Sequence, residues 1–171
     1  MSPAQVLETL LKSYERYYNV QTEDVEPPFA AEAAFHSHDE QYFLIKSAKL
    51  SEAEAHEYVF FAVADLLTLK DAQRLDACAW ERGTARAKPS AHHRSTDVAL
   101  VVLAERIAPD AAAYIEKLKR YQSYRFTFHG WSHYQAIALE TSTGILSYNR
   151  RGRELEKLFR NINLPKTEKG K

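Results

Sequence analysis

Two pairs of histidines in this chain have a spacing that suits metal binding. His36 and His38 stand two residues apart in "FHSHDEQ", and His129 and His133 stand four residues apart in "RFTFHGWSHYQ". Neutral imidazole is a ligand for zinc, copper, nickel and iron. Residues two apart on a strand point to the same face of a sheet, so the first pair suits a metal ion if its segment is extended. The residues leave open whether the two pairs meet in one metal site or are ordinary surface histidines.

The arginine-rich stretch "SYNRRGRELEKLF" suits an anionic ligand. Asn149 is placed to cap a helix that begins just after it, and the free backbone N–H groups at a helix start attract negative charge. Arg150, Arg151 and Arg153 add positive charge and forked hydrogen-bond donors, and Gly152 would let a ligand approach the backbone. These five residues are therefore the predicted site for a phosphate-bearing ligand. The alternative is that acidic side chains of the same chain balance the arginines.

A third stretch, "KLKRYQSYRF", interleaves basic and aromatic residues from Lys117 to Phe126. Proteins that bind nucleic acids use cations on phosphates and aromatic rings under bases. An ordinary amphipathic segment gives the same pattern, and the sequence has none of the fold motifs of the common nucleic-acid-binding domains. Nucleic-acid binding is therefore an alternative and not the main expectation.

The motifs of well-known catalytic sites are absent from the sequence. It has no glycine-rich phosphate-binding loop, no G-x-S-x-G turn and no H-E-x-x-H helix. Cys78 is its one cysteine and has no neighbouring histidine, so it reads as a small buried apolar residue. A well-patterned core without a recognised catalytic set favours a small non-catalytic binding or assembly protein. The alternative is a hydrolase-like enzyme that uses the histidines with a divalent transition metal, and no other cofactor is expected.

Four helices are expected to position these residues. Ser2 and Gln5 form a capping box around a helix that begins at Pro3, and apolar residues then repeat at helical spacing as far as Tyr18. Thr68 with Asp71 is expected to open the second helix, over residues 69–83. The third helix is expected from Pro109 onwards, with Tyr121 on its inward face, and the fourth over residues 151–161.

Apolar segments between the helices predict a β-sheet. "EYVFFAVAD" and "DVALVVLAE" are almost continuously apolar, which is typical of central strands covered on both faces. "YRFTFH" and "SHYQAIALE" are expected to pair around Gly130 and Trp131. The fold class that follows is α+β, a single mixed β-sheet of about six or seven strands with four helices packed against it. The strands are expected over residues 31–38, 41–50, 57–65, 97–105, 124–129, 132–140 and 145–148.

The composition is that of one globular domain. A chain of 171 residues, 45% apolar and 27% charged, is long enough to bury its apolar side chains in one core and is not of the disordered class. We expect residues 1–165 to form the domain and residues 166–171 to be a disordered tail.

The expected setting is the cytoplasm of a bacterial cell. No apolar run approaches the roughly 20 residues of a membrane span, the N-terminus lacks the features of a signal peptide, and one cysteine excludes an internal disulfide framework. Residues 1–65 are mainly acidic and residues 66–171 mainly basic. The basic half either meets an anionic partner or is neutralised by the acidic half. Ten tyrosines suit an interface as well as a core, which leaves both a monomer and a homodimer open.

The order of "EYVFF", "FHGW" and "NRRGREL" resembles an uncharacterised family of small bacterial proteins of unknown function. The resemblance covers most of the chain. It implies no activity, no cofactor and no catalytic residue.

Overall fold

The structure, a computed structural model, describes residues 1–36, 54–89, 93–160 and 162. Within these residues the fold is α+β, with seven strands in one mixed sheet and four helices packed against it, as the sequence predicts. None of the helices in this part of the chain has the length and apolar character of a membrane span. The helices are α1 (Pro3–Tyr14), α2 (Leu69–Ala85), α3 (Pro109–Lys117) and α4 (Glu156–Phe159), with the 3-10 turn η2 (Gly152–Leu155) before α4.

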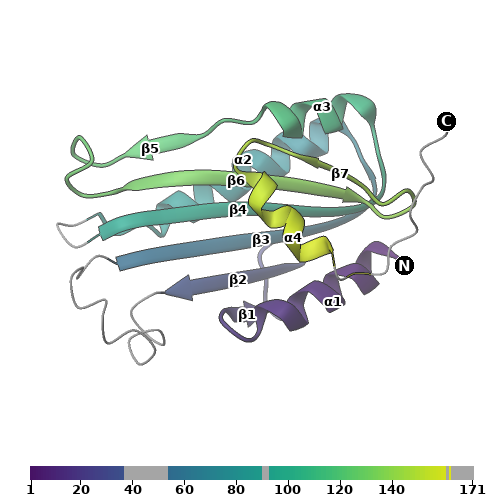
Figure 1. Cartoon of the computed structure of the whole chain (residues 1–171), viewed down its shortest axis with the longest axis horizontal. Helices are drawn as coiled ribbons and strands as arrows, with labels where there is room; N and C mark the ends of the chain where they lie inside the picture. The colour runs from purple at the N-terminus through teal and green to yellow at the C-terminus, as the bar shows by residue number, and fades with distance from the viewer. Residues whose placement is uncertain (37–53, 90–92, 161, 163–171) are drawn as a thin grey trace.

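The sheet has the strand order β1-β2-β3-β4-β6-β5, and β7 pairs with the far end of β6 (Figure 1). The three long strands β3, β4 and β6 run parallel, and the other neighbours pair antiparallel. The chain crosses from β3 to β4 through α2 and leaves β4 through α3. The strands are β1 (Asn19–Gln21), β2 (Ala31–His36), β3 (Glu54–Leu67), β4 (His93–Ile107), β5 (Tyr121–Ser123), β6 (Trp131–Glu140) and β7 (Ile145–Tyr148).

One face of the sheet is covered by α2 and α3, because alternate residues of the central strands are apolar on that side. Phe60, Leu100 and Ala136 are fully buried there beneath the two helices. Gly83 allows α2 to lie close to β4, since a Cβ atom at this position would stand only 2.7 Å from Cγ1 of Val98.

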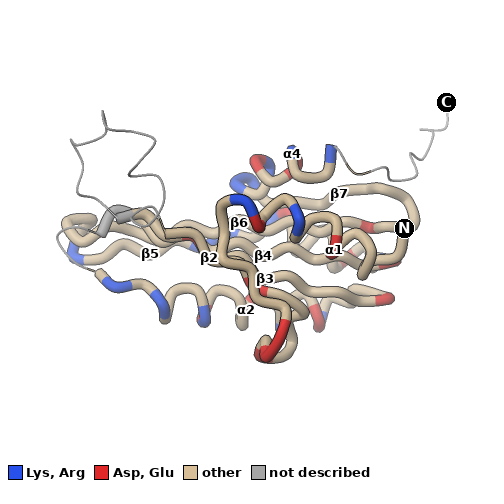
Figure 2. The backbone as a smooth tube through the Cα atoms, turned by 90° about the horizontal axis from the view of Figure 1, so that it is seen from below, with Lys and Arg blue, Asp and Glu red and all other residues tan. Residues whose placement is uncertain are grey.

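The opposite face is covered by α1, η2 and α4, but only over the half that lies toward the carboxyl ends of the parallel strands (Figures 1 and 2). Val6 and Leu10 of α1 are fully buried against Phe61 and Val101 of the sheet. The continuously apolar strands predicted from the sequence are therefore central and covered on both faces. The other half of this face carries no helix among the described elements, and this half positions the candidate site.

A buried carboxylate ties α2 to the segment that follows α3. Asp76 is fully buried, and its carboxylate accepts two hydrogen bonds from Arg120, Nε to Oδ1 at 2.8 Å and Nη2 to Oδ2 at 2.9 Å. The hydroxyl of Tyr114 donates to Oδ2 at 2.6 Å. The carboxylate is thus held by a forked, charge-assisted pair, which is the strong type of ion pair.

Local capping signals correctly predict where α1 and α2 begin. The hydroxyl of Ser2 accepts from the backbone N–H of Gln5, whose side chain in turn accepts from the backbone N–H of Ser2 at 2.8 Å. The hydroxyl of Thr68 caps α2 by accepting from the backbone N–H of Asp71 at 3.1 Å, and it donates to Oδ2 of Asp71 at 2.7 Å. The first helix ends at Tyr14 rather than near Tyr18, and the chain then forms the short edge strand β1, which the sequence analysis does not predict.

The prediction of a strand over residues 124–129 is wrong. The strand that pairs with the start of β6 is β5, and the chain then turns through Arg125, Phe126 and Thr127, whose φ angles are 47°, 54° and 76°. Three consecutive residues in the left-handed region do not fit an extended strand. Tyr121 accordingly lies on β5 with 56% of its surface exposed, and not on the inward face of α3, which ends at Lys117. The predicted strand over residues 41–50 and the predicted tail lie outside the described residues.

Candidate functional site

Four polar side chains lie on the half of the sheet face that α1 and α4 do not cover. Glu57, Asp97 and His133 are direct neighbours on β3, β4 and β6, because Glu57 is in register with Asp97 and Asp97 with His133. Gln135 follows two residues after His133 on β6 and therefore points to the same side. We call these four residues the polar row. Glu57 and Asp97 each stand directly before the apolar stretch of their strand, so the row borders the buried core.

Tyr18 holds one end of the polar row. Its hydroxyl donates a hydrogen bond to Oε2 of Glu57 at 2.7 Å, and its ring packs between Tyr14 and Phe35, at centroid distances of 4.8 Å and 5.5 Å. Burial raises the pKa of Glu57, the hydrogen bond from Tyr18 lowers it, and the charges of Asp97 and Glu154 raise it again. The carboxyl group of Glu57 is thus half-buried, with one of its oxygens fixed by a phenol.

Asp97 and His133 have pKa values that move toward each other. Burial raises the pKa of Asp97, while the charge of Arg151 and a backbone hydrogen bond from His133 lower it, and Glu154 raises it. Burial lowers the pKa of His133, and the charge of Arg151 lowers it further. An acid with a raised pKa beside a histidine with a lowered one is the arrangement found where side chains bind or exchange protons.

Two oxygen atoms of the polar row have no hydrogen-bond partner within the described part of the chain. These are Oδ1 of Asp97 and Oε1 of Gln135, and both are buried. A buried acceptor left without a donor costs about 1–3 kcal/mol, and folded proteins contain few such atoms. Both atoms are acceptors, so the group that would satisfy them is a donor of hydrogen bonds.

The raised pKa of Asp97 predicts a dependence of stability on pH. The folded protein holds a proton on this carboxyl group more tightly than the unfolded chain, in which the pKa is ordinary, about 3.9. Its contribution to the free energy of unfolding is therefore fully present below that ordinary value and is lost as the pH rises through the raised one. We expect Asp97→Asn to remove this loss, and hence to raise the melting temperature near neutral pH.

Thermal melts of the parent and of Asp97→Asn across the acidic and neutral range would measure this effect. Asp65→Asn is a suitable control, because Asp65 is exposed at the carboxyl end of β3. The lowered pKa of His133 changes stability with pH in the opposite direction, but His133 is present in both proteins, so its contribution cancels in the comparison. Equal or lower stability of Asp97→Asn at neutral pH would contradict the argument from burial.

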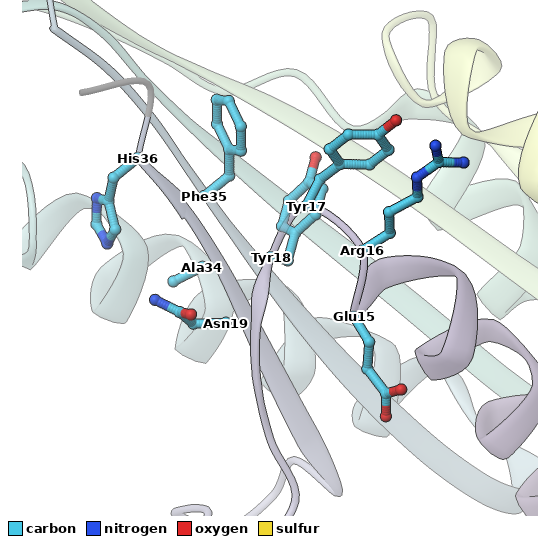
Figure 3. Close-up of a pocket in the computed structure, with 8 residues that line it drawn as sticks. All are labelled: Glu15, Arg16, Tyr17, Tyr18, Asn19, Ala34, Phe35 and His36. Atoms are coloured by element: carbon cyan, nitrogen blue, oxygen red, sulfur yellow. The ribbon is translucent and has the colours of Figure 1, made fainter. Parts of the chain in front are cut away.

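A small pocket of about 140 Å³ is lined in part by Tyr18, whose hydroxyl binds Glu57 of the polar row. It lies between the turn that follows α1 and strand β2, and it shares Tyr18 and Phe35 with the surroundings of Glu57. Figure 3 shows Glu15 and Arg16 pointing away from each other, so these two charges do not face a common ligand. Sites for drug-sized molecules usually measure about 300–1,000 Å³. The pocket is therefore too small to hold a drug-sized molecule by itself.

The structure does not bring His36 and His133 together. His36 lies on β2 and faces the α2 side, where its ring contacts that of Tyr58, whereas His133 lies in the polar row on the α1 side. Strands β3 and β4 also stand between them. His129 is in the turn before β6, and His38 lies outside the described residues. Across the ranges that the structure describes, no group of three or more His, Cys, Asp or Glu side chains is arranged to hold a metal ion.

The predicted anion site is used largely for internal contacts. Asn149 is buried, and its Oδ1 accepts hydrogen bonds from the backbone N–H groups of Ala136 at 3.0 Å and Gly152 at 2.7 Å. Its Nδ2 donates to the carbonyl oxygens of Leu118 at 3.2 Å and Tyr134 at 3.1 Å. Asn149 thus joins η2, β6 and the end of α3 instead of presenting an amide to a ligand.

The glycine and the arginines of this stretch also have different surroundings from those predicted. A Cβ atom on Gly152 would overlap the carbonyl oxygen of Ala136, so the glycine allows close approach to β6 and not to a ligand. Arg150 and Arg153 are exposed, and Arg151 lies near enough to the polar row to act on Asp97 and His133. The single predicted helix over 151–161 is a 3-10 turn followed by the four-residue helix α4.

The sequence does not predict that these four residues come together, although His133 is among its candidate metal ligands. One pattern in the sequence could have indicated the two carboxylates: a charged residue stands directly before each of two continuously apolar strands. Glu57 lies two residues before Val59, and Asp97 two residues before Ala99, and both apolar residues point inward. Alternation then places both carboxylates on the core side of the sheet. Buried carboxylates are rare unless they are paired, so this pattern indicates a functional or strongly coupled group.

Comparison with known proteins adds a family and no activity. Residues 3–161 match the model of a family described as Domain of unknown function (DUF8052). The match runs from α1 through α4 and includes all four residues of the polar row. No curated protein and no solved structure matches the chain significantly.

Proposed function

The chain belongs to the family of the domain of unknown function DUF8052, and from its own residues we propose that it binds a small cationic ligand carrying N–H groups, such as a primary ammonium. The polar row forms the binding site, with Tyr18 and Arg151 at its borders. The observation that carries this proposal is the pair of buried acceptors, Oδ1 of Asp97 and Oε1 of Gln135, that have no donor within the described residues. An ammonium group supplies three donors in a small volume.

The charge balance of the site supports a cation over an anion. The carboxyl groups of Glu57, Asp97 and Glu154 act on one another, with Arg151 as the opposing cation, and burial favours the neutral form of His133. The raised pKa values of Glu57 and Asp97 mean that these groups gain from a proton or from another positive charge nearby. We therefore propose a cationic ligand in place of the anionic one predicted from the arginines. The backbone N–H of Gly152, which that anion would have needed, already donates to Asn149.

The surroundings of the row suit the apolar part of such a ligand. Tyr121 is in register with His133, and their ring centroids lie 5.2 Å apart. Trp131 lies two residues before His133 on β6, with its ring centroid 6.3 Å from that of the histidine. Aromatic faces attract cations, by about 0.5–1 kcal/mol at exposed sites.

The proposed setting is a bacterial cytoplasm, which agrees with the single cysteine of the chain.

The decisive experiment compares primary amines with their trimethylammonium analogues. Both carry one positive charge, but only the primary amine donates hydrogen bonds. We expect the full chain to be stabilised by a primary amine in thermal shift and calorimetric titration, and to bind the methylated analogue at least roughly tenfold more weakly, since about 1.4 kcal/mol corresponds to a factor of ten. Asp97→Asn should abolish the binding, whereas Asp65→Asn should not.

Two outcomes would overturn the proposal. One is equal binding of the two analogues, since donors would then play no part. The other is binding of phosphate or nucleotides that depends on Arg151 and not on Asp97, which would restore the anionic ligand.

A second candidate function is acid–base catalysis at the same row. It is favoured by the raised pKa of Asp97, because a general acid or base works best when its pKa lies near the working pH. The lowered pKa of His133 favours the neutral imidazole, the form that can accept a proton. Turnover of an amine-bearing substrate that is lost in His133→Gln, while binding of that substrate persists, would establish catalysis. Binding without turnover in the parent protein would leave the role of a binding protein.

A further inference from the structure

Two histidine side chains lie next to each other on the other face of the sheet, which α2 and α3 cover. His36 of β2 and His56 of β3 are direct cross-strand partners, with their Nδ1 atoms 2.7 Å apart. The ring centroids are separated by 4.9 Å, and the rings meet at 67°. Both side chains are half-buried. Two imidazole nitrogens are therefore held close together by the backbone pairing of two neighbouring strands.

We propose that His36 and His56 bind a divalent transition metal ion through their Nδ1 atoms, with Cu²⁺ preferred. Metal–nitrogen distances to histidine are about 2.0–2.1 Å, so two adjacent ligands of a square-planar ion stand about 2.9 Å apart and those of a tetrahedral ion about 3.3 Å apart. The two Nδ1 atoms are hydrogen-bonded at 2.7 Å in the structure, so they need to separate less to reach the square-planar spacing than to reach the tetrahedral one. Cu²⁺ prefers this geometry and also binds nitrogen ligands more tightly than Zn²⁺ does.

The surroundings of the pair fit a metal with open positions. Because the two rings are only half-buried, water can fill the remaining coordination sites. Tyr58 packs edge-on against His36, at a centroid distance of 5.8 Å, and supports the ring from the core side. Arg86 stacks over Tyr58, and its charge is balanced by Glu32, with Nη2 2.7 Å from Oε2. The negative charge of Glu32 thus offsets the positive charge of Arg86, which reduces the repulsion between Arg86 and a bound metal ion.

In the structure the two Nδ1 atoms form a hydrogen bond, in which one imidazole donates its N–H to the other. The two states differ in their protons, because a metal needs the lone pairs of both nitrogens and displaces any proton between them. Copper binding should therefore release protons, whereas a purely structural pair should be indifferent to copper.

The test is a copper titration of the full chain, purified without a histidine tag and stripped with a chelator. We expect one Cu²⁺ per chain and a paramagnetic resonance spectrum with coupling to two nitrogens. Loss of a group that merely orients a ligand costs about 10–100-fold in metal affinity, so His36→Gln and His56→Gln should each weaken binding by at least about tenfold. His133→Gln is the matched control, since His133 lies on the opposite face, and it should bind copper as the parent does.

Copper binding that is unchanged in both His36→Gln and His56→Gln would overturn the proposal, and so would the absence of a copper complex at micromolar concentrations. Circular dichroism of the two variants checks that they are folded, and Zn²⁺ should bind more weakly than Cu²⁺ at the same site. The site is independent of the ligand proposed for the polar row. Asp97→Asn should therefore keep the copper site while losing the amine.

Discussion

Replacing Asp76 with alanine is expected to lower the free energy of unfolding by about 3–5 kcal/mol, the range measured when one partner of a buried ion pair is removed. Asp76 is fully buried, and its carboxylate accepts from Arg120 and from Tyr114. The substitution leaves these donors facing a cavity. Because Arg120 keeps about a third of its side chain exposed, 33%, the guanidinium can reach water, and the lower end of the range is expected.

Urea denaturation measures this change, and Glu8→Ala is the matched control. Glu8 pairs with Lys12 at 3.2 Å, but their side chains are 71% and 70% exposed, and exposed pairs contribute only about 0.2–1 kcal/mol. A double-mutant cycle with Arg120→Ala then isolates the coupling between the two charges. A loss below about 1 kcal/mol in Asp76→Ala, or additive effects in the cycle, would contradict a strong buried pair.

The substitution Gly152→Ala is expected to destabilise the fold by about 3 kcal/mol, the upper part of the range for overpacked positions. The added Cβ would overlap the carbonyl oxygen of Ala136 and stand 2.9 Å from its carbonyl carbon and 2.8 Å from Oδ1 of Asn149. Two of these atoms belong to the backbone of β6, which lies within the sheet and has little freedom to move. The hydrogen bonds that Asn149 makes to β6 and η2 would be strained as well.

Chemical denaturation of Gly152→Ala and Arg153→Ala separates two explanations for the glycine. Arg153 is the next residue of η2 and is exposed, so its truncation should change stability by no more than about 0.5 kcal/mol. If the glycine served ligand access instead of packing, Gly152→Ala would leave stability unchanged and would weaken binding alone.

The elements that the sequence predicts well are those specified by local signals. α1 and α2 begin at side-chain caps formed by residues three apart, Ser2 with Gln5 and Thr68 with Asp71. The central strands β3 and β4 are specified by apolar runs long enough to be covered on both faces. In each case the physical cause lies within one short stretch of chain, and no knowledge of strand order is required.

The sequence predicts a hairpin that ends in β6, but the position of its first strand, β5, could not be predicted in this way. The alternation in "YRFTFH" favours a strand, yet Phe126 and Phe128 are 91% and 81% exposed and the chain turns between them. The position of β5 is related instead to tertiary contacts of the preceding segment, in which Arg120 is bound to Asp76 and the carbonyl of Leu118 to Asn149. Such contacts between distant residues override local preference.

The candidate sites depend on strand order, which one sequence does not reveal. Glu57, Asp97 and His133 become neighbours only because β4 lies between β3 and β6. The sequence likewise points to His36 with His38, whereas the structure pairs His36 with His56 across two strands. In both cases the residue type shows that a side chain could bind a ligand. The strand register decides which of these side chains lie together in one site.

The alternation of side chains along β3 places strict limits on insertions and deletions. His56 and Glu57 are consecutive, so His56 points to the α2 side of the sheet, toward His36, and Glu57 points to the opposite side, into the polar row. Adding or removing a single residue between Glu57 and the apolar run would shift both onto the wrong faces at once and separate each from its partner. We therefore expect length variation among members of the family to be confined to the connections between strands, while β3 keeps a constant length from His56 through Phe61.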